Sequence, residues 1–557
     1  MPTTDVLILN RDRLLPNTKV VSEQVTALSL LDATTANFAL TNAIWLFERP
    51  GHADGETFSL VEHLRQSLRA TLDIYPQWCG HLKAVTVVNE AVSDEIRRLP
   101  QHAQRYGRVY VHYGTAHDPG VELVIARSSY TLDAIYSVSR TRDQPLWNRK
   151  TVPFKNLVPQ TNIASALDPN EPNEYGVCNP SMAIQITETA CGGFILAAKI
   201  AHPLADISSL VGFVKNWADV SCSMLTGDFV KSPRPLFDPG QLDAAAAGNI
   251  NDEKPDAVFI QQAESLPLHR YDWWATSSKA PWPTKVPDAF EAKNLAAAGN
   301  PMPWSEWDVS APVSEYIVHL NNHQVEFLHS EANQGASYRI SRHDALVAHI
   351  WSCIMRARNL EADTGPVHCD LVYGVRPALN LGKAFLGSPT MMINVEMSGA
   401  GVTATTETAE EGKRASLQPI AQRIRETINE VGQPSHLAAF LHRLAYEASP
   451  QRLWQAFLGQ RHVLVTSWAR AGIYDIDFGV GSSIRYADGV VPALDGIVLI
   501  KEAPPSKSTS THEESPVQSW TGSGIDVSIN IREEDMQRLL KDPLLLPTNT
   551  EQIYFVC

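Results

Sequence analysis

Strand-length and helix-length apolar patterns alternate along this chain, on both sides of one long proline-rich stretch. Apolar residues three and four positions apart predict helices at 60–72, 344–355, 416–431, 436–446 and 533–540. Short apolar runs predict strands at 183–187, 194–200, 315–320, 369–375, 391–397 and 525–531. Interleaving of this kind predicts an α/β chain with mixed sheets that are flanked by helices.

The proline-rich stretch divides the 557 residues into two parts of similar size. It covers about Ser232–Trp307 and includes the tract Pro281–Pro287. We therefore expect an N-terminal half at 1–230, a crossover linker at 231–310 and a C-terminal half at 311–557, each half large enough for its own core. A second irregular segment at 503–524, rich in Ser, Thr and Pro, predicts an exposed loop.

The charge balance excludes several kinds of partner. Lys and Arg number 46 and Asp and Glu number 61, which gives a formal net charge of −15 at pH 7. Nucleic acids and anionic membranes attract basic surfaces, so neither is an expected partner. No apolar run reaches the roughly 18–20 residues of a membrane helix, and no signal peptide is recognisable. We expect a cytoplasmic protein that is monomeric.

The seven cysteines stand singly along the chain, and no two form a Cys-x-x-Cys pair. This spacing is typical neither of a disulfide framework nor of a zinc site. We therefore expect free thiols and no bound metal.

One histidine stands at a position that suits catalysis. The strand at 194–200 is followed by His202-Pro-Leu-Ala-Asp206 and then by a helical pattern. Pro203 disfavours helical angles at His202, so His202 should close the strand, while Asp206 should cap the helix. A histidine held rigidly at a strand end suits a general base. The motif alone is weak, because one chance match is expected among 18 histidines. A core histidine beside an ordinary capping aspartate is the alternative.

A second unusual string lies far downstream. An apolar strand runs into Thr466-Ser467-Trp468, and Asp477-Phe-Gly479-Val-Gly481 follows after eight residues. A kinase interpretation of Asp-Phe-Gly fails, because the chain has no Gly-rich loop, no Val-Ala-Ile-Lys and no His-Arg-Asp loop.

Together these motifs resemble those of the BAHD acyltransferases, which move an acyl group from a coenzyme A thioester to an alcohol or amine. The family carries His-x-x-x-Asp in its first half and Asp-Phe-Gly-Trp-Gly in its second. Further segments that match family motifs cover most of the chain: 27–32, 64–82, 341–351, 373–377 and 386–388. The segment 266–274 is more typical of fungal members of the family than of plant members. The resemblance implies two chloramphenicol-acetyltransferase-like halves with an active-site channel between them.

The chain departs from the family pattern at three positions. Val480 replaces the tryptophan of Asp-Phe-Gly-Trp-Gly, Ser388 replaces the asparagine of Phe-Gly-Asn, and Gly374 replaces the aspartate of Val-Asp-x-Arg. These changes affect the expected lining of the thioester channel and leave the expected base in place.

The resemblance implies roles for the motif residues. His202 is the expected general base, and Thr466, Ser467 and Trp468 are the expected stabilisers of the oxyanion. Polar pairing within a strand and a core tryptophan are the alternative for those three. Asp206 is expected to form an ion pair with Arg376, and Asp477, Gly479 and Gly481 are expected to shape a turn near the thioester channel. No Gly-x-Ser-x-Gly nucleophile is present, so we expect direct transfer without an acyl-enzyme.

Coenzyme A is the expected co-substrate, with a small-molecule acceptor, and no permanently bound cofactor is expected. Ser341 and Arg342 open a helix and could hold its phosphates, although a solvated helix start is an equal alternative. Gly387 and Ser388 are expected contacts through the Phe-Gly-Asn resemblance. Two functional alternatives remain: a member retooled for a reaction such as cyclisation, and a condensation-type enzyme that uses a carrier-protein thioester.

Overall fold

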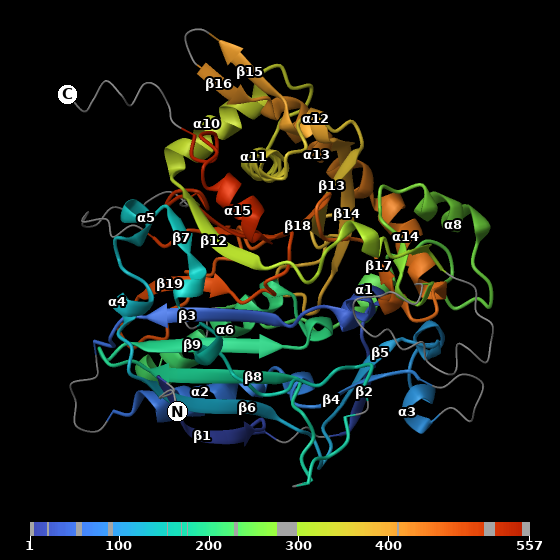
Figure 1. Cartoon of the computed structure of the whole chain (residues 1–557). Coiled ribbons are helices and arrows are strands. Elements are labelled where there is room, and N and C mark those ends of the chain that lie inside the picture. The colour runs from blue at the N-terminus through green and yellow to red at the C-terminus, as the bar shows by residue number, and fades with distance from the viewer. Residues whose placement is uncertain are drawn as a thin grey trace.

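Two mixed sheets form the framework of the molecule (Figure 1). The computed structural model describes residues 5–18, 22–51, 58–86, 93–152, 154–168, 170–174, 176–227, 232–275, 298–408, 412–505 and 519–547. The first sheet has the strand order β1 (Val6–Leu14), β6 (Val121–Ser128), β8 (Met182–Glu188), β9 (Phe194–Ile200), β3 (Thr41–Phe47) and β19 (Ile484–Gly489). The second has the order β14 (Thr390–Ser398), β13 (Pro366–Gly374), β18 (His462–Ser467), β20 (Ile497–Glu502), β21 (Ile525–Arg532), β12 (Val313–Leu320) and β7 (Leu146–Asn148).

Each sheet takes an edge strand from the other half of the chain. β19 comes from the C-terminal half and pairs antiparallel with β3, and β7 comes from the N-terminal half and pairs antiparallel with β12. A division of the chain near residues 230 and 311 therefore does not separate the two sheets. Both exchanged strands are short, so the apolar pattern did not reveal them.

Helices cover the sheets as the amphipathic spacing predicts. On the first sheet, α2 (Leu60–Leu72) packs against α6 (Ile207–Thr226). On the second, α11 (Arg342–Ala357) is buried along almost its whole length between α10 (Asn322–Asn333), α13 (Leu417–Val431) and α15 (Glu533–Leu539). The predicted α/β class with helix-flanked mixed sheets is confirmed. No helix in the described ranges combines the length and apolar character needed to cross a bilayer.

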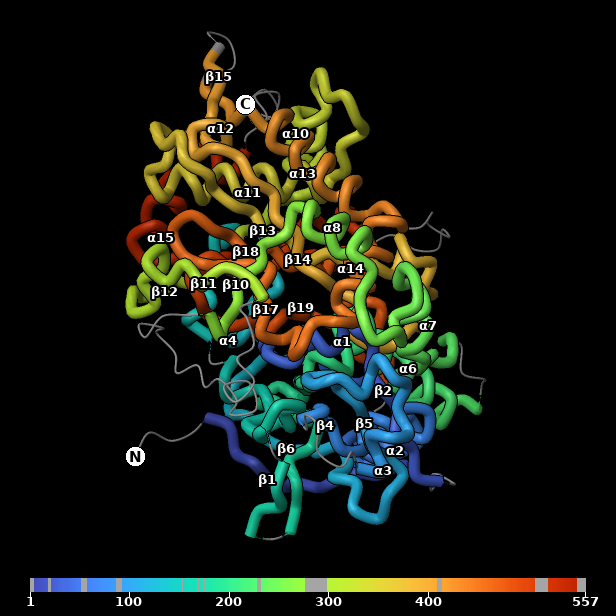
Figure 2. The backbone as a smooth tube through the Cα atoms, turned by 90° about the vertical axis from the view of Figure 1, so that its right-hand side faces the viewer, coloured from blue at the N-terminus to red at the C-terminus, as the bar shows by residue number. Residues whose placement is uncertain are grey.

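The crossover is more ordered than its proline content suggested. It contains α7 (Pro239–Asp243) and α8 (Ala257–Glu264), and α8 packs on α14 (Pro434–Tyr446) (Figure 2). A small sheet then joins β10 (Tyr271–Asp272) to β11 (Asn300–Pro301) and to β17 (Leu453–Trp454) of the C-terminal half. The tract 281–287 and most of the predicted loop at 503–524 lie outside the described residues.

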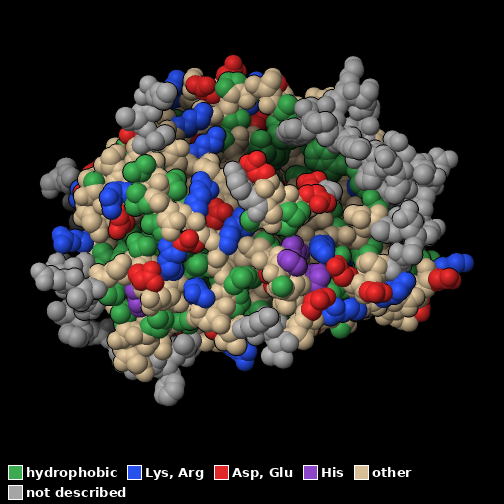
Figure 3. Space-filling model, turned by 90° about the horizontal axis from the view of Figure 1, so that it is seen from below, with side chains coloured by type: hydrophobic (Ala, Val, Ile, Leu, Met, Phe, Trp, Pro, Cys, Tyr) green, Lys and Arg blue, Asp and Glu red, His purple; other side chains and the backbone are tan. Residues whose placement is uncertain are grey.

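The face seen from below carries acidic and basic side chains in a mixed pattern (Figure 3). Among the side chains drawn there in colour, Lys and Arg alternate with Asp and Glu and form no continuous basic field.

Candidate active site

A cavity of about 480 Å³ opens between the two sheets. The N-terminal half contributes His202 and the start of α6, and the C-terminal half contributes the ends of β13, β14 and β18. Besides Phe38 and Trp468, four tryptophans and a phenylalanine line it, namely Trp273, Trp304, Trp307, Trp454 and Phe457. The sequence did not predict this wall of four tryptophans and Phe457.

His202 stands in the short connection between β9 and α6. The strand ends at Ile200, as predicted, and His202 begins a single 3-10 turn that ends at Leu204. This differs from the expectation that His202 would close the strand. Pro203 occupies an early position of the turn, where its missing N–H removes no hydrogen bond. The turn therefore fixes His202 just before the N-terminus of α6.

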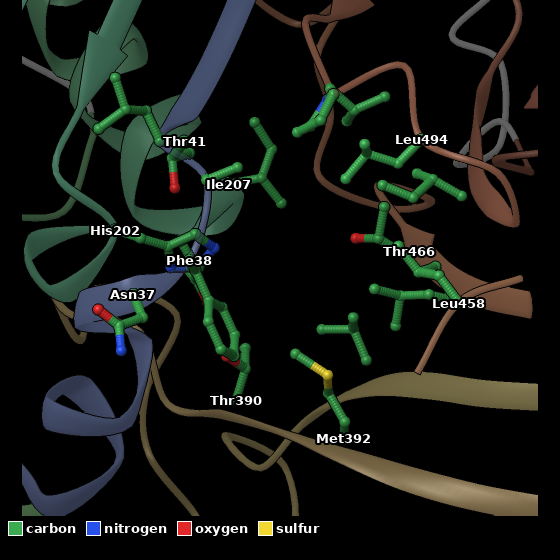
Figure 4. A pocket seen from close by; sticks show the side chains of 18 of the residues that line it. Asn37, Phe38, Thr41, His202, Ile207, Thr390, Met392, Leu458, Thr466 and Leu494 are labelled. Carbon is green, nitrogen blue, oxygen red and sulfur yellow. The ribbon is translucent and has the colours of Figure 1, made fainter. Parts of the chain in front are cut away.

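The ring of His202 is held from two sides. Its Nδ1 lies 2.8 Å from the Ser388 hydroxyl. The Phe38 ring meets it edge-on at 5.4 Å between centroids, and Figure 4 shows these two side chains next to each other. Burial lowers the pKa of His202 below 6.5, and the negative charge of Asp206 partly offsets this effect. The imidazole is therefore neutral at pH 7. When Nδ1–H donates to Ser388, Nε2 carries the free lone pair.

Asp206 is bonded to the fold around the site. It caps α6 by accepting the Ser209 N–H at 2.9 Å, as predicted, and it forms an ion pair with Arg376 whose Nη2 donates at 3.0 Å. Arg376 also donates to the Phe385 carbonyl. The expected Asp206–Arg376 pair is present, and it ties the His202 loop to the C-terminal half.

Gly387 and Ser388 contact the His202–Asp206 loop. The Gly387 carbonyl accepts the Asp206 N–H at 3.0 Å, and the Ser388 N–H donates to Asp32 at 2.5 Å. Gly387 has a φ of 128°, and a Cβ there would lie 2.8 Å from the Asp32 carboxylate. Burial raises the pKa of Asp32 to about 7. These contacts hold the His202 loop, and the coenzyme contacts predicted for Gly387 and Ser388 stay a prediction.

The predicted oxyanion residues lie across the cavity from His202. Thr466, Ser467 and Trp468 all line the cavity at the end of β18, and Figure 4 shows Thr466 facing His202. The Trp468 backbone N–H already donates to Ile500 at 2.8 Å. The two hydroxyls and the indole N–H are therefore the donors to consider on this wall.

The Asp477–Gly481 turn fastens the C-terminal half to α6. Asp477 accepts the Gly479 N–H at 2.8 Å, and Ser221 of α6 donates to the Phe478 carbonyl at 2.7 Å. Gly479 has a φ of 75°, and a Cβ there would come within 2.9 Å of Cys222. Asp477, Gly479 and Gly481 are not among the residues that line the cavity.

Ser341 and Arg342 line a second pocket, also of about 480 Å³, at the N-terminus of α11. Ser341 caps the helix together with Asp344, and Arg342 donates to Glu326 at 2.6 Å. The guanidinium groups of four arginines and the Trp520 ring border the pocket: Arg339, Arg342, Arg425 and Arg470. Arg470 follows Ser467 by three residues, so this pocket begins within about 10 Å of chain from the catalytic cavity.

Two mixed sheets enclose a histidine-bearing cavity, and the His202 loop is bonded across their junction. A model of the Transferase family, that of the BAHD acyltransferases, matches residues 115–512, and the chain belongs to this family. The chain is 25% identical to acyltransferase AFT15-1 of Alternaria alternata, with 97% of each chain covered. It is 22% identical to acyltransferase abl6 of Leptosphaeria maculans, with 97% of this chain and 98% of that protein covered.

Solved structures share the fold. The chain matches TRI101 of F. graminearum, complexed with ethyl coenzyme A, with a TM-score of 0.63 at 13% identity, covering 94% of this chain and 98% of that one. It matches vinorine synthase with a TM-score of 0.57 at 16% identity, covering 96% and 98%.

Proposed function

We propose that this acyltransferase moves an acyl group from acyl-coenzyme A directly onto a hydroxyl (or amine) of a small acceptor, with His202 as the general base. The observation that carries the proposal is the neutral His202 ring in the inter-sheet cavity, with Nδ1 on Ser388 and Nε2 free to accept a proton.

The chemistry follows from that geometry. An acceptor hydroxyl has a pKa far above 7, so Nε2 of His202 takes its proton as the oxygen attacks the thioester carbonyl. The tetrahedral oxyanion forms opposite, where Thr466, Ser467 and the Trp468 indole supply donors. When the intermediate collapses, the coenzyme thiolate leaves and the proton on His202 passes to it. General-base help of this kind is worth roughly 100- to 10,000-fold.

The cavity wall favours a neutral, largely apolar acceptor. Asp206 and Arg376 are the only acidic or Lys/Arg side chains among the described lining residues, and they neutralise each other. A diamine would find no unpaired carboxylate on this wall, and a polycarboxylate would find no unpaired cation. Aromatic rings at Trp304, Trp454 and Phe457 suit ring systems or apolar chains.

We place the coenzyme phosphates in the pocket at the start of α11. Ser341, Arg342 and Arg470 border it, and guanidinium groups bind phosphates in bidentate fashion. The α11 N-terminus adds the positive end of a helix dipole. The pantetheine arm would then run along the end of β18 toward His202.

The test is thiol release from acyl-coenzyme A. Purified protein is incubated with a series of acyl-coenzyme A donors and a panel of neutral apolar alcohols and amines, and free thiol and acylated product are quantified together. Hydrolysis without acylated product, or no turnover with any donor and acceptor, would contradict the proposal.

A matched pair of variants distinguishes the loss of the general base from the general effect of replacing a histidine. His202→Ala should lose acylation, while His117→Ala, at an exposed site, should retain it. Equal activity of the two variants would remove His202 from the mechanism.

A further inference from the structure

Three histidines and an aspartate meet where the crossover lies on the second sheet. His368 and Asp370 are two residues apart on β13, so their side chains share a face. His462 on β18 stands directly opposite His368 in the parallel register. His269 of the crossover completes the cluster, and one ring nitrogen of each histidine lies within 4.8 Å of the others.

The atoms that point into this cluster have no hydrogen-bond partner. His269 Nε2 lies 3.3 Å from Asp370 Oδ1, and His462 Nδ1 lies 3.5 Å from Asp370 Oδ2. Neither contact has hydrogen-bond geometry, so His269 Nε2, His462 Nδ1 and Asp370 Oδ1 are buried and unpaired. Buried polar atoms are almost always paired, and Asp370 is fully buried. Three such atoms in one place are available as ligands for one ion.

The atoms that point outward are held by the surrounding protein. His368 Nδ1 lies 3.1 Å from the Asn394 side-chain oxygen, which leaves His368 Nε2 with the lone pair. Asp370 Oδ2 accepts the Phe457 N–H at 3.0 Å. His462 Nε2 lies 3.6 Å from a Glu306 carboxylate oxygen. Outer partners of this kind fix the tautomers and orientations of metal-binding residues.

We propose that His269, His368, His462 and Asp370 bind one divalent transition-metal ion, with zinc as the best match, in a closed structural site. Three imidazoles and one carboxylate make a four-ligand set with no open position for substrate. Donors around tetrahedral zinc lie about 3.3 Å apart, so histidine nitrogens that lie up to 4.8 Å apart approach one another by as much as about 1.5 Å. The His368 and His462 rings, stacked at 4.4 Å, turn toward the common centre as it closes.

The metal site would stabilise the wall of the His202 cavity that contains Phe457. His269 stacks on Tyr271 at 4.9 Å, and Tyr271 meets Phe457 of that wall. A metal held by His269 on one side and by two strands on the other would fix the crossover against the sheet. It is separate from the proposed acyl transfer, which needs no metal.

The experiment measures bound metal in the full chain after removal of any affinity tag. Inductively coupled plasma mass spectrometry should find about one zinc or other transition-metal equivalent per chain. Prolonged treatment with a strong chelator should lower the Tm by several degrees, and zinc, but not magnesium, should restore it. Fewer than about 0.1 equivalents in the purified protein, together with no rise in Tm on adding zinc, would overturn the proposal.

A matched variant pair tests the assignment of ligands. His368→Gln should lose most of the bound metal, while His319→Gln, at another strand histidine 2.9 Å from a buried aspartate, should keep it. Should His368→Gln fail to fold, the milder Asn394→Ala removes only the outer partner and should weaken zinc affinity by about 10- to 100-fold. Wild-type metal content and affinity in both site variants would overturn the assignment.

Discussion

His202 and the cluster of His269, His368 and His462 present imidazoles in opposite settings. His202 is a single ring that lines an open cavity, and its Nδ1 is held by Ser388. The cluster crowds three rings around one buried carboxylate and leaves no such space. Burial lowers the pKa of both His202 and His368. Burial therefore does not distinguish a general base from a metal ligand. The two are distinguished by how many imidazole lone pairs point to one place and by whether a substrate can reach them.

The largest expected effect comes from removing the base. His202→Ala should reduce kcat by roughly 100- to 10,000-fold, because the acceptor hydroxyl loses its proton acceptor. The Tm should change little, since His202 contributes no hydrogen bond to the core apart from that with Ser388 among its described contacts. Steady-state kinetics and a melting curve on the same sample check both halves of the prediction. A variant with a lowered Tm and an unchanged kcat would show that His202 has a structural role, like the one proposed for the cluster histidines.

The next effect concerns stability. Asp206→Asn leaves the Arg376 guanidinium without its buried anion, and breaking one side of a buried pair costs about 3–5 kcal/mol. Denaturant unfolding should show the lower free energy of unfolding. Loss of turnover at wild-type stability would contradict the structural role of Asp206 and would favour a direct role beside His202.

A smaller effect on catalysis is expected at Ser388. Ser388→Ala removes the hydroxyl on Nδ1 of His202 and should lower kcat by about tenfold, the equivalent of one hydrogen bond. KM should stay near its wild-type value, because the change affects the orientation of the base. A rise in KM for acyl-coenzyme A at constant kcat would instead support the coenzyme contact predicted from the sequence.

The smallest effect is a displacement of the pH profile. His202 acts in its neutral form, so kcat/KM should fall as the pH drops through the His202 pKa, which lies below 6.5. The charge of Asp206 raises that pKa, so Asp206→Asn should move the acid limb to still lower pH. Rate profiles between pH 4 and 8 measure the limb. An apparent pKa above 6.5 in the wild type would contradict a buried neutral base.

The sequence predicted the elements whose patterns are local. α2 and β9 have their predicted bounds, because a 3.6-residue apolar period and a continuous apolar run each identify one structure. β7 and β19 escaped prediction because three- and six-residue edge strands carry no distinctive pattern and are defined by their partners. Tertiary pairing, which no local pattern encodes, decided their place.

In the site, too, features with a local sequence pattern could be predicted and features that depend on tertiary contacts could not. His202 and Asp206 could be predicted because a proline and a helix start frame them, and Arg376 entered through the family resemblance. The contact between Ser388 and His202 joins residues 186 positions apart, and no spacing rule could indicate it. The metal-ligand cluster escaped for the same reason, although His368-x-Asp370 within one strand was a local signal that two polar side chains would share a buried face.

The exchanged edge strands have a consequence for the order in which the molecule is built. The first sheet needs β19, so it remains one strand short until residue 489 has been synthesised. During translation, the N-terminal half therefore waits with the β3 edge unpaired while most of the chain emerges, and an open strand edge is a site for wrong pairing. The first sheet can be completed only after residue 489 and the second only after residue 532, so both sheets are completed late in synthesis.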